Sequence, residues 1–315
     1  MDIITEASIT DICKNHYRYL MNLSSVVGVG CGYKSVNGID TGQPSIHVLV
    51  ENKINNNYVD ANNIIPKSYM GIKTDVIEIG KPIFRNLNDL SKRIRPLQGG
   101  YSISPGGQRF FTGTLGCVVT KKSGKERLYF VLSNSHILSG ENTLKVGTKI
   151  IQPAALDGGD IVKDKIGLLS KSIPIKFESK ISSPVNYMDA AIAKLDDKSL
   201  ASNLIALSGE VKGVLKPSLR LRVKKTGATT GLTKGRIQTV NATIEVDTDG
   251  DGKKIALYKN QIISDIKNDG GDSGALVLDL FNNAVGLLFG GTDKSCIFTD
   301  IKTVLKAFSV EIYIN

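Results

Sequence analysis

The chain has 315 residues, of which 41% are hydrophobic and 22% charged, and its formal net charge is +10. This composition excludes a disordered or fibrous protein, and the length predicts about two domains. No apolar run reaches the roughly 20 residues of a membrane span, and the acidic N-terminus lacks the pattern of a secretory signal. We therefore expect a soluble, cytoplasmic chain without a membrane span.

The positive charge is concentrated in two regions of the sequence. Residues 86–131 carry eight basic and two acidic side chains, and residues 190–245 carry ten and four. Most are single lysines without interleaved aromatic residues, which favours a solvated surface over a specific nucleic-acid site. Non-specific binding of nucleic acid by counterion release is an alternative that the sequence leaves open.

Residues 1–85 have the pattern of a small α+β domain. Apolar residues at helical spacing predict one amphipathic helix over 5–23, and apolar runs at 26–34, 45–53 and 71–80 predict three strands. Residues 86–112 then lose periodicity and are rich in Pro, Gly, Asn, Ser and Arg, which predicts a linker. We expect the N-terminal domain to be regulatory or targeting, and the linker to be a cleavage site for this protein itself or for another protease.

Residues 113–315 predict a mainly β domain. Short β-type runs recur between Gly-rich turns without an intervening helical pattern, which is typical of an antiparallel barrel or sandwich. The final segment DIKTVLKAFSVEI places its apolar residues on one helical face and predicts a closing helix.

Three short motifs in this domain carry candidate catalytic groups. His136 follows the apolar run YFVLS, Asp189 precedes AAIAKL, and Ser273 lies in the turn GGDSG. Taken singly, these would be a core histidine, a turn aspartate and a tight β-turn. Together they occur in the order His, Asp, Ser, one of the known chain orders of a catalytic triad. The glycines of the turn, Gly271 and Gly274, permit a backbone that aims two N–H groups into one concavity, as in an oxyanion hole.

Residues 113–311 resemble the bacterial trypsin-like serine proteases of the chymotrypsin fold. The resemblance is carried by GTLGCVV, VLSNSHIL, MDAAIAKL, GGDSGALV and VGLLFGG, and TGATTGLTKGRI is similar to a segment of the streptogrisin-type proteases. It implies two perpendicular antiparallel β-barrels with the active site in the cleft between them. It also implies that Ser273 is the nucleophile, His136 the general base and acid, and Asp189 the orienting group, with the amides of Gly271 and Ser273 as the oxyanion hole. The implied function is a serine endopeptidase that acts on protein or peptide substrates through an acyl-enzyme and needs no cofactor.

The departures from this family concern the surroundings of the triad. Phe289 stands where many members have a serine that supports the aspartate, and Ile137 follows the histidine where many animal relatives have a disulfide-bonded cysteine. Gly290 and Gly291 are implied as the strand edge that pairs with an extended substrate. Lys267, six residues before Ser273, is implied at the base of the specificity pocket and argues against a preference for Arg or Lys.

The sequence leaves two further interpretations open. One is a catalytically inactive protease-fold binding module, which the presence of all three triad residues disfavours. The other is calcium binding by DTDGDG, residues 247–252, which matches the start of a calcium loop. The twelfth position of that loop is Tyr258 rather than Glu, so a polar hairpin tip is favoured. The four cysteines show no C-x-x-C spacing, which predicts reduced thiols rather than a zinc site.

Overall fold

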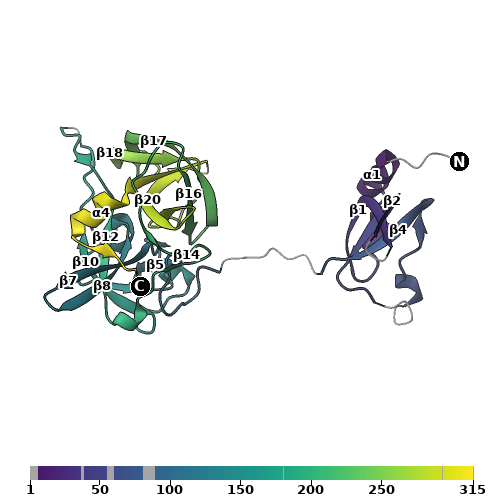
Figure 1. Cartoon of the computed structure of the whole chain (residues 1–315), viewed down its shortest axis with the longest axis horizontal. Coiled ribbons are helices and arrows are strands. Elements are labelled where there is room, and N and C mark those ends of the chain that lie inside the picture. The colour runs from purple at the N-terminus through teal and green to yellow at the C-terminus, as the bar shows by residue number, and fades with distance from the viewer. Residues whose placement is uncertain are drawn as a thin grey trace. The chain divides into compact units, whose positions relative to one another are not determined.

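The computed structural model describes residues 6–36, 39–54, 60–80, 89–179, 181–292 and 294–314. The chain divides into two compact units, Met1–Asn86 and Leu87–Asn315 (Figure 1). The predicted domain end at residue 85 lies one residue from this division. Each unit has its own hydrophobic core.

The N-terminal unit packs two short helices on one face of a four-stranded sheet. Its elements are α1 (Glu6–Asn15), α2 (Arg18–Met21), β1 (Val26–Val36), β2 (Ile39–Val50), the 3-10 turn η2 (Ala61–Asn63), β3 (Ser68–Tyr69) and β4 (Ile72–Glu78). The strand order is β1-β2-β4-β3, with β2 and β4 parallel. The expected single helix over 5–23 is thus wrong in one respect, because it breaks at His16 and Tyr17.

The core of this unit explains why the helical pattern continues across the break. Ile9 and Ile12 of α1, with Leu20 and Leu23 from the second segment, are all buried against the sheet. The apolar positions therefore keep one common face although the helix is interrupted, and a small α+β unit results.

The second unit contains two large curled sheets, and the first of them has eight strands in the order β22-β7-β8-β12-β10-β9-β5-β6. Their bounds are β5 (Ser102–Pro105), β6 (Gly113–Thr114), β7 (Cys117–Ser123), β8 (Glu126–Ser133), β9 (Lys149–Ile151), β10 (Lys165–Ser172), β12 (Ala191–Leu195) and β22 (Glu311–Ile312). Helix α3 (Ser135–Leu138) follows β8 directly. Two 3-10 turns, η3 (Ala155–Asp157) and η4 (Lys198–Leu200), lie in the connections.

The second large sheet is built from the C-terminal half of the unit, in the order β11-β18-β17-β16-β19-β20-β15, with β21 against β18 and β20. Its strands are β11 (Val185–Asn186), β15 (Gly213–Val214), β16 (Arg222–Gly227), β17 (Gly231–Asp247), β18 (Ile255–Ser264), β19 (Leu276–Asp279), β20 (Asn283–Thr292) and β21 (Ser295–Asp300). A separate pair, β13 (Leu204–Ile205) and β14 (Gly209–Glu210), lies between β11 and β15 in the chain.

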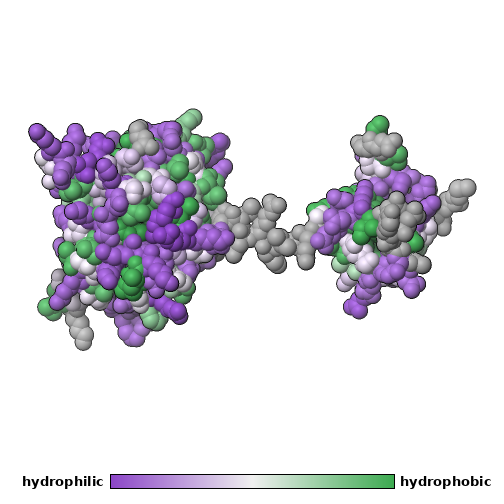
Figure 2. Space-filling view, turned by 90° about the horizontal axis from the view of Figure 1, so that it is seen from below, coloured by the Kyte–Doolittle hydropathy of each residue, from purple (hydrophilic) through white to green (hydrophobic). Residues whose placement is uncertain are grey.

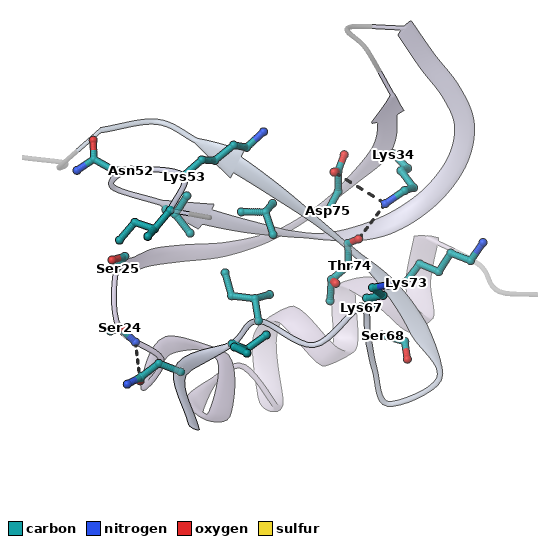
Figure 3. A pocket seen from close by; sticks show the side chains of 16 residues that line it. Ser24, Ser25, Lys34, Asn52, Lys53, Lys67, Ser68, Lys73, Thr74 and Asp75 are labelled. Atoms are coloured by element: carbon teal, nitrogen blue, oxygen red, sulfur yellow. Dashed lines mark hydrogen bonds and ion pairs between the residues drawn. The ribbon is translucent and has the colours of Figure 1, made fainter. Parts of the chain in front are cut away.

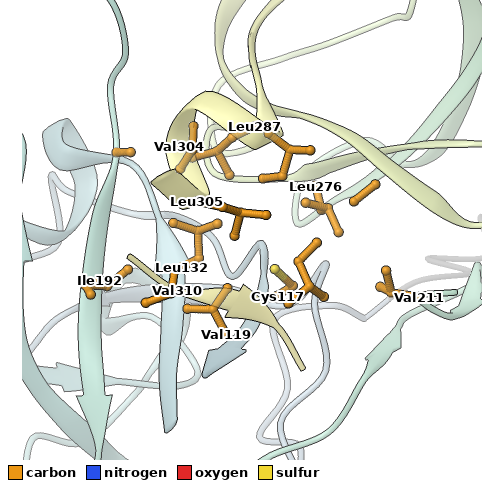
Figure 4. Close-up of a cluster of buried hydrophobic side chains, with 14 of the residues drawn as sticks. Cys117, Val119, Leu132, Ile192, Val211, Leu276, Leu287, Val304, Leu305 and Val310 are labelled. Atoms are coloured by element: carbon orange, nitrogen blue, oxygen red, sulfur yellow. The ribbon is translucent and has the colours of Figure 1, made fainter. Parts of the chain in front are cut away.

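A shared hydrophobic core joins the two large sheets and the closing helix α4 (Ile301–Phe308). Figure 4 shows Leu132 and Ile192 of the first sheet near Leu276 and Leu287 of the second, with Leu305 of α4 among them. After α4 the chain returns to the first sheet, where β22 pairs with β7. The predicted mainly β architecture with a C-terminal helix is confirmed.

The predicted linker over 86–112 is wrong for its described part. Residues 89–112 belong to the second unit, and β5 is fully buried and pairs with both β6 and β9. Leu90 and Leu97 are buried as well. β5 pairs with β9, which lies more than 40 residues further along the chain, so periodicity within the segment could not reveal this pairing. Residues 86–88 of the predicted linker lie outside the described residues.

The surface of the second unit carries its apolar side chains mostly scattered among hydrophilic ones, as the face in Figure 2 shows. Among the described residues, no helix is long and apolar enough to cross a membrane. All four cysteines are free thiols, as expected.

Candidate active site

The structure brings His136 and Asp189 into direct contact. His136 lies on α3, immediately after β8, and Asp189 lies just before β12, which pairs with β8. The imidazole Nδ1 is hydrogen-bonded to Asp189 Oδ2. The other carboxylate oxygen accepts the backbone N–H groups of Ser135 at 2.6 Å and His136 at 3.1 Å. Three hydrogen bonds thus fix a carboxylate that is only 3% exposed.

This contact determines how easily His136 takes up a proton. Burial by itself lowers the pKa of His136, but the charge of Asp189, its hydrogen bond and the charge of Glu141 outweigh burial, so that the pKa is raised. The imidazole is 23% exposed, which leaves Nε2 on the opposite side of the ring able to meet another group. A histidine held in this way can accept a proton at Nε2 while the carboxylate stabilises the imidazolium.

Ser273 lies on a turn whose backbone is set by two glycines with positive φ, Gly271 at 94° and Gly274 at 96°. Side chains other than glycine rarely adopt this conformation. Three carbonyls of this turn accept hydrogen bonds from threonines: Thr229 Oγ1 donates to Gly270 O at 2.6 Å, Thr114 Oγ1 donates to Gly271 O at 2.7 Å, and Thr114 N donates to Ser273 O at 2.7 Å.

With the carbonyls turned toward these donors, the amides of Gly271 and Ser273 are left without a protein acceptor among the described residues. Two such N–H groups beside a serine hydroxyl can stabilise a developing oxyanion. The role of Gly271 and Ser273 as an oxyanion hole stays a prediction.

Asp272, the residue between them, forms a buried ion pair that sequence reasoning missed. Its Oδ2 lies 2.5 Å from Nζ of Lys225, and both side chains are fully buried. Burial lowers the pKa of Lys225, and the charge of Asp272 opposes that shift. The pair anchors the Ser273 turn to β16 across 47 residues of sequence.

The segment after Lys225 completes the binding site for this carboxylate. Asp272 Oδ1 accepts the backbone N–H groups of Thr229 at 3.1 Å and Thr230 at 3.0 Å. A Cβ at Gly227 would lie 2.2 Å from Asp272 Oδ1, so only glycine permits this approach. The sequence KTGATTG, whose role no local pattern indicates, is thus the support of the Ser273 turn.

The segments that carry Ser273 and His136 both pack against strand β6. A Cβ at Gly113 would lie 2.7 Å from Ile137 Cγ1 and 2.8 Å from Ser273 O, so the segments that carry the two groups meet at this glycine. The Ser273 hydroxyl donates to Phe289 O at 3.4 Å, and no hydrogen bond joins it to His136 among the described contacts. The Ser273 hydroxyl is half-buried and can turn about its Cα–Cβ bond. This rotation requires no movement of the His136–Asp189 pair.

The edge of β20 beside Ser273 has the form expected of a peptide-binding strand. Gly290 and Gly291 pair with β21 on one edge, and β19 pairs with β20 only as far as Leu287. In the part of the chain that the structure describes, no strand pairs with the other edge of 289–291. An extended peptide could add there as a strand.

Phe289 contributes its carbonyl to this edge rather than its side chain. The ring is buried and packs against Tyr258, with ring centroids 4.7 Å apart. Support for Asp189 comes instead from the amides of Ser135 and His136. Asp189 is thus hydrogen-bonded although Phe289 stands where many family members have a serine.

The structure does not place Lys267 at the base of a pocket. Lys267 is exposed, and its carbonyl accepts from Thr233 Oγ1 at 3.0 Å. The next residue, Asn268, is buried, and its Oδ1 has no hydrogen-bond partner among the described residues. A Cβ at Gly291 would lie 3.0 Å from Asn268 Nδ2, so this amide borders the β20 edge. Asn268 directly follows Lys267, the residue that lies six positions before Ser273.

The calcium-like segment 247–252 is a hairpin tip between β17 and β18, as favoured from the sequence. Asp247 accepts backbone N–H groups of Gly250 at 2.9 Å and Gly252 at 3.0 Å, and Asp251 is paired with Lys253. Among the described residues, no three His, Cys, Asp or Glu side chains gather in a way that could hold a metal ion.

The second unit is similar to solved bacterial serine proteases. A Nocardiopsis protease superimposes with a TM-score of 0.51 at 19% identity, over 69% of this chain and 98% of that chain. This unit has the chymotrypsin-like serine protease fold. A further match is Thermobifida fusca protease A, with a TM-score of 0.49 at 18% identity, over 69% of this chain and 98% of that chain. Another is a glutamic acid specific serine protease, with a TM-score of 0.49 at 21% identity, over 69% of this chain and 100% of that chain.

The protease-fold unit and the N-terminal unit have different relatives. Residues 7–79 match the family model of the NARROW LEAF 1 N-terminal domain. No curated protein has a sequence that matches this chain. The N-terminal unit is therefore not part of the protease fold and carries its own family resemblance.

Proposed function

We propose that the chain is a serine endopeptidase in which Ser273 is the nucleophile, His136 the general base and acid, and Asp189 the group that orients the imidazole. The observation that carries this proposal is the His136–Asp189 pair in one unit with a Ser273 turn whose two amides have no protein acceptor. Ser273 Oγ attacks the scissile carbonyl as His136 Nε2 takes its proton, and the oxyanion meets the amides of Gly271 and Ser273. Collapse of this intermediate transfers the proton from His136 Nε2 to the leaving amine and forms the acyl-enzyme. Water, deprotonated by the same histidine, then hydrolyses the ester, releases the carboxylic acid and restores the Ser273 hydroxyl.

The buried Lys225–Asp272 pair supports catalysis without a separate activation step. It fixes Asp272, which lies between Gly271 and Ser273, so the turn needs no cleavage of the chain to form. The TGATTGLTKGRI segment supplies this support, and its likeness to streptogrisin-type proteases favours a relation to that group. Gly290 and Gly291 bind the substrate backbone, and Asn268 borders the side chain of the residue before the scissile bond.

A non-catalytic binding module is the second candidate. The observation that favours it is that the Ser273 hydroxyl points to Phe289 O and not to His136. Such a module would use the β20 edge to bind peptides and would leave them intact.

Labelling with a fluorophosphonate probe separates the two candidates. The proposal requires that the probe adds covalently to Ser273, and that Ser273→Ala and His136→Ala both abolish labelling in folded protein. Peptide binding without any labelling would favour the binding module. A cleavage-site profile on a mixture of cellular proteins, with Ser273→Ala as the control, would then give the substrate preference.

A further inference from the structure

The N-terminal unit contains a cavity of about 750 Å³, within the range of ligand-binding pockets. It lies where the ends of β2 and β4 meet the segment around η2, and Ser24 N donates to Asn63 Oδ1 at 3.1 Å across one end (Figure 3). The cavity belongs entirely to residues 24–76, so the proposed peptidase site has no part in it.

The rim of the cavity is strongly basic. Four lysines line it, Lys34, Lys53, Lys67 and Lys73, against one acidic side chain, Asp75. Lys34 lies 4.0 Å from Asp75 and also donates to Thr74 O at 3.1 Å. The other three lysines have no ion pair among the described residues, so their charges are available to a ligand.

These three charges are spread around the cavity and do not converge on one point. Figure 3 shows Lys53 on one side and Lys67 and Lys73 on the other. A single phosphate would be held by donors that meet at one place. Separated ammonium groups suit a ligand that carries several carboxylates along its length.

Five apolar side chains also line the cavity. Val50 and Val76 line it from the strands, and Ile65 lines it from the facing segment. Ile54 and Ile64 are also part of the lining and are 50% and 36% exposed. Covering these exposed isoleucines with a binding partner would remove apolar surface from water, which is favourable.

From this combination we propose that the cavity is a docking site for an acidic protein segment that carries a bulky apolar side chain. The apolar side chain enters between Ile54 and Ile64, and flanking Asp or Glu residues meet Lys53, Lys67 and Lys73. Charge complementarity selects the peptide, and burial of the apolar side chain provides affinity. The site would bring acidic proteins to this chain independently of what the protease-fold unit does with them.

The test is binding of a short peptide in which Glu alternates with Leu and which ends in Trp. The protein has no Trp, so the fluorescence anisotropy of the probe reports binding directly. The full chain with Ser273→Ala is used, so that hydrolysis cannot occur and a failure of the proposed peptidase leaves this result unaffected. We expect saturable binding that weakens with rising salt, and no binding of the same peptide with Lys in place of Glu.

Two matched variants decide where the probe binds. Lys53→Gln/Lys67→Gln/Lys73→Gln should weaken binding by about tenfold, since the three exposed charge pairs with the ligand are lost together. The control Lys121→Gln/Lys122→Gln/Lys125→Gln removes the same charge from exposed positions of the second unit and should bind normally. Equal losses in both variants would overturn the proposal, because general attraction to a basic protein would then explain binding.

The apolar half of the proposal has its own test. Ile54→Ser/Ile64→Ser alters two exposed side chains and should weaken the Glu–Leu probe while leaving a weaker Glu–Gly probe unchanged. An unchanged affinity for the Glu–Leu probe would contradict the proposal. Displacement of the probe by inorganic phosphate at low concentration would also contradict it, because the cavity would then be a small-anion site.

Discussion

The carboxylate of Asp272 lies 2.5 Å from the ammonium of Lys225, with both side chains fully buried. Neither charge can be solvated, so the carboxylate depends on Lys225, on the Thr230 hydroxyl and on the amides of Thr229 and Thr230. Because Asp272 lies between Gly271 and Ser273, the same contact that satisfies the charge also fixes the oxyanion-binding turn.

We therefore predict that Lys225→Met destabilises the second unit by about 3–5 kcal/mol, the usual cost of leaving one buried charge unpaired. Peptide hydrolysis should fall as well, because the turn loses its anchor. Denaturant unfolding in a Ser273→Ala background measures the stability change. Lys234→Met, at an exposed position of β17, is the control and should unfold at the wild-type midpoint. An unchanged midpoint for Lys225→Met would contradict the role given to this pair.

The division at Asn86 and Leu87 predicts where the chain is first cut in limited proteolysis. Residues 89–112 are held by sheet pairing, so cuts there would require opening of β5, whereas the boundary joins two separately packed cores. We expect a fragment that starts near Leu87, and cooperative unfolding of an isolated 1–86 fragment. First cuts within 95–112 would contradict this. If only the wild type, and not Ser273→Ala, is cut on standing, then the chain processes itself.

The sequence allowed prediction of those parts of the site that depend on residue type and chain order. His136, Asp189 and Ser273 could be found because each stands beside a strand with a local apolar pattern. Lys225 could not, because a lysine in the run LRLRVKKTG has the pattern of an exposed strand position and its partner is 47 residues away. The same reason explains β5, whose burial depends on β9 and not on any periodicity of its own. Long-range pairing of polar groups leaves no local signal.

Asn268 provides a prediction about substrate preference. In the described part of the chain, its buried Oδ1 has no hydrogen-bond partner, which costs free energy unless the substrate supplies a donor. We expect peptides with a hydrogen-bond donor at the side chain before the scissile bond to be preferred over aliphatic ones. Asn268→Leu should reverse this order, and kcat/KM for matched peptide pairs measures it. Lys267→Gln, at the exposed neighbouring position, should leave the order unchanged.

The triad should behave as one catalytic unit. Ser273→Ala, His136→Ala and the double variant should lose similar activity, because each removes the same proton-transfer step. Asp189→Asn should reduce kcat by about 10⁴-fold through the wrong imidazole tautomer. His16→Ala and His47→Ala, in the N-terminal unit, are controls that should hydrolyse a short peptide normally. Near-wild-type turnover by folded His136→Ala would exclude the proposed mechanism.

The pKa of His136 sets the pH dependence of activity. The general base must be neutral, and the charge of Asp189 raises the pKa of His136 despite burial. Activity should therefore fall as pH drops through a midpoint above the ordinary value of about 6.5. Glu141 also raises this pKa, so Glu141→Gln should move the midpoint of kcat/KM to lower pH while the plateau at high pH stays the same.

The stability of the fold should depend on the same titration, but it should fall with rising pH where activity rises. A histidine whose pKa is higher in the folded state than in the unfolded state stabilises the fold below the unfolded value, and this contribution is lost as pH rises through the folded value. The thermal midpoint of the Ser273→Ala protein should thus fall with rising pH across this range, relative to Ser273→Ala/His136→Ala. Parallel curves for the two proteins would show that the His136–Asp189 pair does not form in solution, and the acid limb of the activity profile would then need another group.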